Sequence, residues 1–224
     1  MAEELVSCEI AEGIAEITLD DTKRNALSPA LLTEFEAAVD AAESADAAIV
    51  LAGREGAFSA GYDLRVVEKG MDEMLAMMDK GAGLMIRLLA YPKPVVIACT
   101  GHAIAGGALF LCCADRRVGA AGDFKIGMNE VSIGLPVPAM ANELIRDRIV
   151  TSEVTRATLE AHLYDPVEAR SAGWLDDVVG ADALITTARA DAERMLGLNA
   201  AAFATSKAIG RKDLLGRLNQ ARSR

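Results

Sequence analysis

Hydrophobic positions alternate in the first part of the chain and then recur at helical spacing. Residues 7–20 (SCEIAEGIAEITLD) contain two alternating runs joined at Ala11–Gly13, a pattern typical of a β-hairpin. Residues 28–44 (SPALLTEFEAAVDAAES) carry apolar side chains at helical spacing, with Ser28 suited to the N-cap and Pro29 to the first helical position. The side chains predicted to face the core are Leu31, Leu32, Phe35, Ala38, Val39 and Ala42. We therefore expect a hairpin followed by an amphipathic helix.

Two continuous apolar runs predict buried strands, and each is followed by a segment that contains glycine. Residues 47–53 (AAIVLAG) form the first run and lead into a predicted loop, residues 54–64 (REGAFSAGYDL). Residues 95–100 (VVIACT) form the second run and lead into another predicted loop, residues 101–107 (GHAIAGG). Methionine-rich helices are predicted between these units, from Met71 to Leu89. A strand followed by a glycine loop thus occurs twice, which favours an α/β fold.

The remainder of the chain alternates less regularly. A short strand is expected at residues 116–121 (RRVGAA), and residues 124–138 (FKIGMNEVSIGLPVP) form a loop-rich segment. From Ala139 onward the pattern is mostly helical, with a capping box at Asp165–Glu168. Residues 173–179 (GWLDDVV) begin with a helix-ending glycine and give one last short strand.

We divide the chain into two regions, with the boundary inside this mostly helical remainder. Residues 1–161 are predicted to form an α/β core, and residues 162–224 a mainly helical C-terminal region. With 224 residues and 52% hydrophobic content, the chain is long enough to bury a substantial core.

Composition excludes several classes of partner and places the protein in the cytoplasm by default. The net charge of −10 and the dispersed Lys and Arg residues argue against a nucleic-acid surface. No apolar run approaches the ~20 residues that span a bilayer, so no membrane association is expected. The first ten residues, MAEELVSCEI, lack the basic and apolar regions of a secretory signal.

Cysteine and histidine usage gives little support for a disulfide framework or a metal site. The cysteines show no CxxC spacing and lie mostly in apolar runs, which is typical of reduced, buried thiols whose pKa values are raised. They are Cys8, Cys99, Cys112 and Cys113. With only His102 and His162 as histidines, we expect no bound metal.

The familiar catalytic motifs are absent. The stretch AFSAG around Ser59 resembles a G-x-S-x-G nucleophile elbow, but Ala57 stands where the strained turn needs glycine. The segment GHAIAGG matches neither a Walker loop nor a G-x-G-x-x-G fingerprint. A serine nucleophile and a phosphate loop are therefore disfavoured.

The two glycine segments offer backbone chemistry instead. Gly61–Tyr62 and Gly106–Gly107 each follow a strand, and each can direct an N–H into a shared cleft, where two convergent donors make an oxyanion hole. The alternative is that these glycines only form turns or let a helix pack closely. The stretch Ile104–Asp115 (IAGGALFLCCAD) raises both possibilities, because two glycines precede a helix-length run with no charge before its last residue.

Glu130 is the candidate acid–base group. It is a lone carboxylate in an apolar stretch, where desolvation raises a carboxyl pKa towards that of a useful base. Its apolar neighbours are Ile126, Met128, Val131 and Ile133. The alternative is a solvated or ion-paired loop glutamate, which is common for carboxylates.

Three segments in order resemble the crotonase family, which contains the enoyl-CoA hydratases and isomerases. ITLDDTKRNALSPALL resembles its first strand, CoA-binding turn and following helix. LAGREGAFSAGYDL is similar to its first oxyanion loop, and PKPVVIACTGHAIAGGALFLCCAD to its second. The resemblance implies a ββα spiral core with a helical C-terminal region that builds a homotrimer or a hexamer.

The resemblance also implies roles for individual residues. Tyr62 and Gly106 would donate the two oxyanion N–H groups, and the helix after Gly106 would assist through its dipole. Lys23, Arg24 and Ala26 would lie on the turn that meets CoA, with Ala60, Asp63 and Leu64 around the adenine end. The alternative for the basic pair is an ordinary exposed turn. CoA is then part of the substrate, and no further cofactor is expected.

One departure from the family pattern bears on the reaction. Hydratases of the family hold water between two glutamates, but the first of these positions is Leu109 here, and only the second, Glu130, is retained. IGMNEVSIG is similar to the corresponding string of the mitochondrial 3,2-trans-enoyl-CoA isomerases of fatty-acid metabolism, which work with this single glutamate. We therefore expect an isomerase. The alternatives are an enoyl-CoA hydratase of the same family and a non-catalytic CoA-ligand binder.

Overall fold

The main sheet of the protein contains a hairpin at one edge and parallel strands beyond it. The computed structural model describes residues 4–222, and the sheet within this range has the strand order β1-β2-β4-β7-β9-β11. β1 and β2 are antiparallel, as predicted, and the other neighbours are parallel. The strands are β1 (Val6–Ala11), β2 (Ile14–Leu19), β4 (Ala48–Gly53), β7 (Val95–Cys99), β9 (Arg116–Ala120) and β11 (Asp177–Val179).

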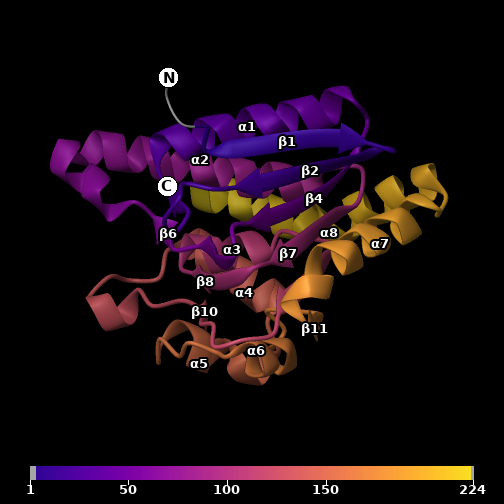
Figure 1. The fold of residues 1–224 in the computed structure, drawn as a ribbon. Coiled ribbons are helices and arrows are strands. Elements are labelled where there is room, and N and C mark those ends of the chain that lie inside the picture. Colours follow the sequence, from indigo (N-terminus) through magenta and orange to yellow (C-terminus); the bar gives the residue numbers. More distant parts are fainter. Residues whose placement is uncertain (1–3, 223–224) are drawn as a thin grey trace.

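Helices cover both faces of this sheet (Figure 1). Alternate residues of β4 divide between two cores: Ile49 and Leu51 belong to the larger one, whereas Val50 belongs to the smaller one. The larger core includes buried residues of α1 (Pro29–Ser44), α2 (Met71–Ala90), α3 (Gly106–Leu111), α4 (Ala139–Arg148) and α8 (Ala200–Arg222). The smaller core is closed by α7 (Leu184–Leu196). The predicted α/β core is therefore confirmed.

α1 has the boundaries and the buried face that its sequence predicts. Ser28 is the N-cap and its side chain accepts a hydrogen bond from the Leu31 N–H, while Pro29 occupies the first turn. The buried residues of the helix are Leu31, Leu32, Phe35, Ala38, Val39 and Ala42.

The two segments predicted as loops contain short strands, which corrects the prediction. Within residues 54–64, β5 (Gly56–Ser59) pairs with β8 (Gly101–Ile104), and β6 (Gly61–Tyr62) pairs with β3 (Ala26–Leu27). β8 lies in the other predicted loop and also pairs with β10 (Ile126–Gly127). These pairings join segments far apart in sequence, so the local pattern does not predict them.

The uncharged helix is shorter than predicted. α3 ends at Leu111, because the chain tightens there: Cys113 N–H donates to Phe110 O and Ala114 N–H to Leu111 O. Asp115 then joins the main sheet, with its N–H donating to Val95 O. A six-residue helix adds little macrodipole, so the predicted dipole assistance is weaker than a long helix would give. The methionine-rich segment is one continuous helix, α2.

The C-terminal region is helical and also supplies the last strand of the main sheet. α6 (Pro166–Ala172) has the predicted capping box at Asp165–Glu168, and Gly173 ends it with a left-handed backbone. α8 packs against α2 and α4 (Figure 1). The remaining helices are α5 (Val154–Thr158) and the 3₁₀ turns η1 (Leu64–Lys69), η2 (Val131–Ile133), η3 (Thr151–Glu153) and η4 (Ala181–Ala183). The boundary at residue 161 stays a prediction.

The cysteines form no disulfide within residues 4–222, and three of them lie in the core. Cys99, Cys112 and Cys113 are buried, whereas Cys8 is half-buried. Burial raises the pKa of Cys99 to about 12 and that of Cys112 to about 11. None of the helices among residues 4–222 combines the length and the apolarity that crossing a bilayer requires.

Candidate active site

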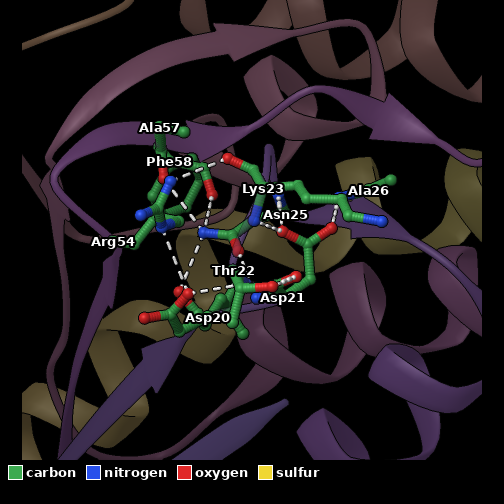
Figure 2. A network of polar contacts seen from close by, with 10 residues as sticks. Asp20, Asp21, Thr22, Lys23, Asn25, Ala26, Arg54, Ala57 and Phe58 are labelled. Atoms are coloured by element: carbon green, nitrogen blue, oxygen red, sulfur yellow. Dashed lines mark hydrogen bonds and ion pairs between the residues drawn. The ribbon is translucent and has the colours of Figure 1, made fainter.

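The turn between β2 and β3 is held by two buried or half-buried polar side chains (Figure 2). The Asp21 carboxylate accepts hydrogen bonds from the backbone N–H groups of Lys23, Asn25 and Ala26 at 2.7–3.1 Å. Burial opposes ionisation of Asp21, but these N–H groups outweigh it and lower its pKa. The turn therefore has one defined shape that presents Lys23 and Arg24.

Asn25 connects this turn to the first glycine segment. Its side chain is fully buried and donates to the carbonyl oxygens of Leu19, Ala57 and Phe58 at 2.8–3.2 Å. Figure 2 shows it between the turn and the end of β5. Asn25 adopts a positive φ of 52°, which asparagine tolerates better than most residues. The turn between β2 and β3 and the strand β5 are thus one hydrogen-bonded unit.

A basic cavity of about 510 Å³ lies beside this unit. Lys23, Arg24 and Ala60, which the family resemblance assigns to CoA, line it together with Arg54 and His102; their role in binding CoA stays a prediction. Arg54 is anchored by its bond to Lys23 O at 3.0 Å and by an ion pair with Asp20 at 3.2 Å. The other lining residues are Glu55, Gly56, Ala57 and Ile104. Basic side chains therefore converge here although the chain as a whole is acidic.

The remaining residues expected around CoA do not line this cavity. Ala26 lies in β3 and pairs with Gly61. Asp63 caps η1 by accepting from the Arg65 N–H, and its ion pair with Arg65 lowers its pKa. Leu64 is 49% exposed on η1.

Arg54 and His102 were missed by the analysis of the sequence. Arg54 directly follows β4, and His102 and Ile104 occupy alternate positions of β8. For His102 and Ile104, the signal in the sequence is their spacing of two residues, which places both side chains on one face of a strand. This spacing has meaning only once residues 101–104 are recognised as a strand.

The two glycine segments lie against one another. A Cβ atom placed on Gly61 would be 2.9 Å from Ile104 O and 3.2 Å from the Gly106 nitrogen, so only glycine permits this approach. Gly61 also has a φ of +83°. The sequence prediction that these segments share one site agrees with this proximity.

The backbone N–H groups of Tyr62 and Gly106 are both available to bind a ligand. Asp63 N–H donates to Leu27 O, and because N–H groups alternate in direction along a strand, the Tyr62 N–H points away from β3. Ala105 has the positive φ of 53° and precedes α3, whose first residue, Gly106, has no acceptor for its N–H among residues 4–222. Unpaired backbone N–H groups that lie where two glycine-containing segments meet are a feature of anion-binding sites.

The Tyr62 side chain fills the space beside these groups. Its hydroxyl donates to Met78 O at 3.3 Å, and burial raises its pKa. A Cβ on Gly81 would lie 2.3 Å from this hydroxyl, and one on Gly106 would lie 3.1 Å from the ring. The ring is therefore wedged between α2 and α3.

Glu130 is half-buried at the start of η2, and its carboxylate lacks a full set of partners. The Oε2 atom is buried without a hydrogen-bond partner among the described residues. Its backbone carbonyl, in contrast, accepts from the N–H groups of Ile133 and Leu135 at 3.0 and 2.9 Å, so the backbone is fixed. Burial raises the pKa of Glu130, and weaker contacts with backbone N–H groups oppose that shift.

The surroundings of Glu130 differ in part from the prediction. Ile126 and Met128 are buried, as expected, but Val131 and Ile133 are 43% and 50% exposed. The η2 turn points these two side chains outward because it breaks the alternation of a strand. Leu109, the other position that bears on the reaction, is buried in α3.

Metal ligands do not cluster here. No group of three or more His, Cys, Asp or Glu side chains within residues 4–222 is arranged to hold a metal ion.

Comparison with known proteins identifies what this arrangement is similar to. Residues 9–223 match the family described as enoyl-CoA hydratase/isomerase. A crystal structure of an enoyl-CoA hydratase/isomerase family protein from Pseudomonas syringae superposes with a TM-score of 0.95 at 39% identity, covering 98% of this chain and 95% of the other.

Curated relatives carry both activities in their names. Mitochondrial enoyl-CoA delta isomerase 1 of Mus musculus is 31% identical over 199 residues, 87% of this chain and 69% of the mouse protein. A probable enoyl-CoA hydratase of Bacillus subtilis is 31% identical over 141 residues, which are 61% of this chain and 54% of that protein. Hydratase names are more common than isomerase names among these relatives.

Proposed function

This chain belongs to the enoyl-CoA hydratase/isomerase family, and we propose that it moves the double bond of an acyl-CoA thioester from the 3- to the 2-position. The observation that supports this best is the carboxylate of Glu130, which has a buried oxygen without a partner. A base needs such a free lone pair, and burial favours a pKa close to the working range of an acid–base catalyst. Leucine at position 109 leaves this carboxylate without the second glutamate of a hydratase.

The reaction then needs one base and one oxyanion hole. Glu130 removes a proton from C2 of the 3-enoyl thioester. The electron pair of that C–H bond forms a C1=C2 double bond as the carbonyl π pair moves onto the thioester oxygen, which gives a dienolate. The N–H groups of Tyr62 and Gly106 stabilise the negative charge on the thioester oxygen. Protonated Glu130 returns the proton to C4, which gives the 2-enoyl thioester. When C4 takes up this proton, the carbonyl re-forms and the C1=C2 pair becomes the C2=C3 double bond.

The basic cavity supports the choice of a CoA thioester. Lys23, Arg24 and Arg54 place positive charge around a space of about 510 Å³, which suits the phosphate groups of the CoA nucleotide. His102 adds a ring nitrogen: its Nδ1 accepts from the Lys125 N–H at 3.0 Å, so in the neutral ring the proton lies on Nε2. In this proposal CoA is part of the substrate. A homotrimer or hexamer stays the predicted oligomeric state, and the cytoplasm stays the predicted location.

Hydration of 2-enoyl-CoA is the second candidate, because hydratase names are more common among the relatives. Addition of water needs a water molecule that is oriented and deprotonated, which hydratases of this family achieve with two carboxylates. Leu109 has no polar atom in its side chain and cannot take part. A hydratase would therefore have to recruit another acidic residue.

Product identification tests the proposal. Purified protein is incubated with 3-enoyl-CoA and, separately, with 2-enoyl-CoA thioesters of several lengths, and the products are separated and identified by mass and by comparison with standards. We expect 2-enoyl-CoA from 3-enoyl-CoA, with no gain of the mass of one water molecule. Formation of 3-hydroxyacyl-CoA as the main product would contradict it.

A further inference from the structure

Ser59 lies where three segments of the site meet, although it is not a nucleophile of an elbow motif. It is the last residue of β5 and is 1% exposed. Its hydroxyl donates to Asn25 O at 2.7 Å and accepts from the Gly61 N–H at 3.2 Å. Because both hydrogen-bonding directions are used, the hydroxyl is fixed in orientation and has no free proton to lose to a base.

The hydroxyl fixes the first glycine segment. Gly61 has a positive φ and directly precedes Tyr62, the residue whose N–H is the first proposed donor. The bond from the Gly61 N–H to Ser59 Oγ closes a tight local turn of two residues. The direction of the next peptide N–H, that of Tyr62, depends on this turn because consecutive peptide planes share one Cα atom.

The backbone and Cβ of Ser59 contact the second glycine segment. A Cβ placed on Gly107 would lie 2.4 Å from Ser59 O and 2.8 Å from Ser59 Cβ. Glycine at 107 is therefore required for α3 to come this close to β5. The start of α3, which carries the second proposed donor at Gly106, is thus located by its contact with the same residue.

The third segment is the turn between β2 and β3. Asn25 accepts the Ser59 hydroxyl through its carbonyl, and its own side chain binds Ala57 O and Phe58 O at 3.0 and 3.2 Å. The neighbouring carbonyl of Arg24 accepts from the Ala60 N–H at 2.9 Å. Lys23 and Arg24, which line the basic cavity, are therefore connected to Ser59 through one short stretch of backbone.

We propose that Ser59 is a positioning residue that holds the N–H groups of Tyr62 and Gly106 in one geometry and connects that geometry to the turn that carries Lys23 and Arg24. This rests on the proposed function, because it assumes that these N–H groups bind the thioester oxygen. Ser59 itself does not contact the reacting atoms. Its contribution is to keep the two donors aligned, which matters because small errors in catalytic geometry reduce the rate strongly.

The test compares Ser59→Ala with the unmodified protein. Alanine keeps the Cβ that contacts Gly107 and removes only the hydroxyl. We expect kcat for 3-enoyl-CoA to fall about tenfold or more with KM changed less than about threefold, since donor alignment matters most in the transition state. Ser59→Cys, which retains a weak hydrogen-bonding group, should lie between the two.

A spectroscopic readout separates positioning from a loss of stability. A saturated acyl-CoA with ¹³C at the thioester carbonyl is bound to each protein, and the carbonyl stretch is measured by infrared difference spectroscopy. In the unmodified protein the stretch should lie below that of the free thioester, and in Ser59→Ala it should move back toward the free value. The control is Thr158→Val, which removes another buried hydroxyl, bonded to Val154 O at 2.8 Å, and should leave the stretch and kcat unchanged.

The possible outcomes distinguish this proposal from the proposed function. If the unmodified protein shows no lowered carbonyl stretch, the oxyanion hole itself is wrong. If the stretch is lowered equally in the unmodified protein, Ser59→Ala and Ser59→Cys, the hole is present and Ser59 does not position it. Should Ser59→Ala fail to fold, the same comparison with Ser59→Cys decides, and an unchanged stretch there overturns the proposal.

Discussion

The carboxylates of Asp115 and Glu130 are both shielded from water at least in part, but they differ in their hydrogen-bond and ion-pair partners. The Asp115 side chain is 11% exposed and accepts from the Val95 N–H at 2.8 Å and from Lys207 Nζ at 2.6 Å, while Arg211 pairs with its other oxygen at 2.8 Å. The Oε2 atom of Glu130 has no partner among the described residues.

The difference separates a structural carboxylate from a reactive one. Donors on both oxygens leave Asp115 no vacant acceptor position, and they fix α8 to the N-terminal ends of β7 and β9 through Lys207 and Arg211. Glu130 has a free lone pair and a raised pKa, because burial is not compensated by charged donors. Burial alone therefore does not make a carboxylate a catalyst; a vacant acceptor position is also needed.

Glu130→Gln should have the largest effect on turnover. The amide keeps the shape of the side chain but cannot accept the proton, so isomerisation should fall roughly a hundredfold to ten-thousandfold, with acyl-CoA affinity nearly unchanged. Turnover and binding are measured on the same preparation. Retention of more than about a tenth of the rate would remove Glu130 from the role of base, since general bases contribute more than that.

The free energy of unfolding of Glu130→Gln provides a control, because the direction of its change can be predicted. The pKa of Glu130 is raised in the folded protein, so the folded state binds a proton more tightly than the unfolded state does. Its charged form therefore costs stability at any pH above the raised pKa, and stability falls as pH rises through that window. Glu130→Gln should be as stable as the unmodified protein at neutral pH, or slightly more stable.

The backbone N–H of Gly106 resembles the Oε2 atom of Glu130 in that it has no hydrogen-bond partner among the described residues. Replacing this residue with glycolate turns the amide N–H into an ester oxygen without adding a side chain, which matters because a Cβ would lie 3.0 Å from Leu27 and 3.1 Å from the Tyr62 ring. Loss of one oxyanion donor should lower kcat about 10²- to 10³-fold. Gly106→Ala, which keeps the N–H, is the control for crowding. An ester variant with full activity would contradict the assignment.

Asp115→Ala should lower the free energy of unfolding, whereas Glu130→Gln should lower turnover. Removing this carboxylate leaves Lys207, whose side chain is 6% exposed, without its ionic partner, and breaking such a buried pair costs about 3–5 kcal/mol. Chemical denaturation measures the loss. Turnover per folded molecule should change little. A variant as stable as the unmodified protein would show that the cluster does not hold α8 in place.

The pH dependence should follow Glu130 and not Asp115. The base acts when deprotonated, so kcat/KM should rise about tenfold per pH unit below the pKa of Glu130 in the free protein and level off above it. Because burial raises that pKa, the midpoint should lie above the ordinary value of 4.5. The profile is recorded with Asp115→Asn as the matched control, whose midpoint should coincide. A midpoint at or below 4.5 would contradict the proposed surroundings of the base.

Leu109→Glu should have the smallest effect, and it tests why one carboxylate rather than two is present. The new side chain would restore the glutamate pair of a hydratase and should introduce or raise hydration of 2-enoyl-CoA. The gain should be small because catalytic geometry must be held within about 0.5 Å and the surroundings fit leucine. Leu109→Gln is the control without charge, and a melting curve accompanies both. Equal hydration by both variants would exclude a role for the added carboxylate.

Local signals in the sequence predicted local structure well. The hairpin at Ala11–Gly13, the cap and buried face of α1, and the capping box at Asp165–Glu168 each depend on neighbouring residues, and each is confirmed. β5 and β8 were predicted as loops because their stability comes from pairing with distant strands. The same limitation hid His102, whose place on the cavity follows from β8.

The family resemblance supplied positions for the candidate site, and their roles stay predictions; Ala26, Asp63 and Leu64 do not line the basic cavity. Lys23, Arg24 and Ala60 line the basic cavity, and the raised pKa of Glu130 agrees with its apolar sequence context. The exposure of Val131 was not predicted, because apolar residues in a loop-rich segment give no period from which to assign a buried face.

The most direct test of the single-base account is the ratio of two rates in the unmodified protein. The kcat/KM for isomerisation of 3-enoyl-CoA and that for hydration of 2-enoyl-CoA are measured at the same chain length, temperature and pH. With a partnerless buried oxygen on Glu130 and leucine at 109, isomerisation should be much the faster reaction. If hydration of 2-enoyl-CoA is instead much faster, Leu109 does not determine the reaction, and the protein is a hydratase.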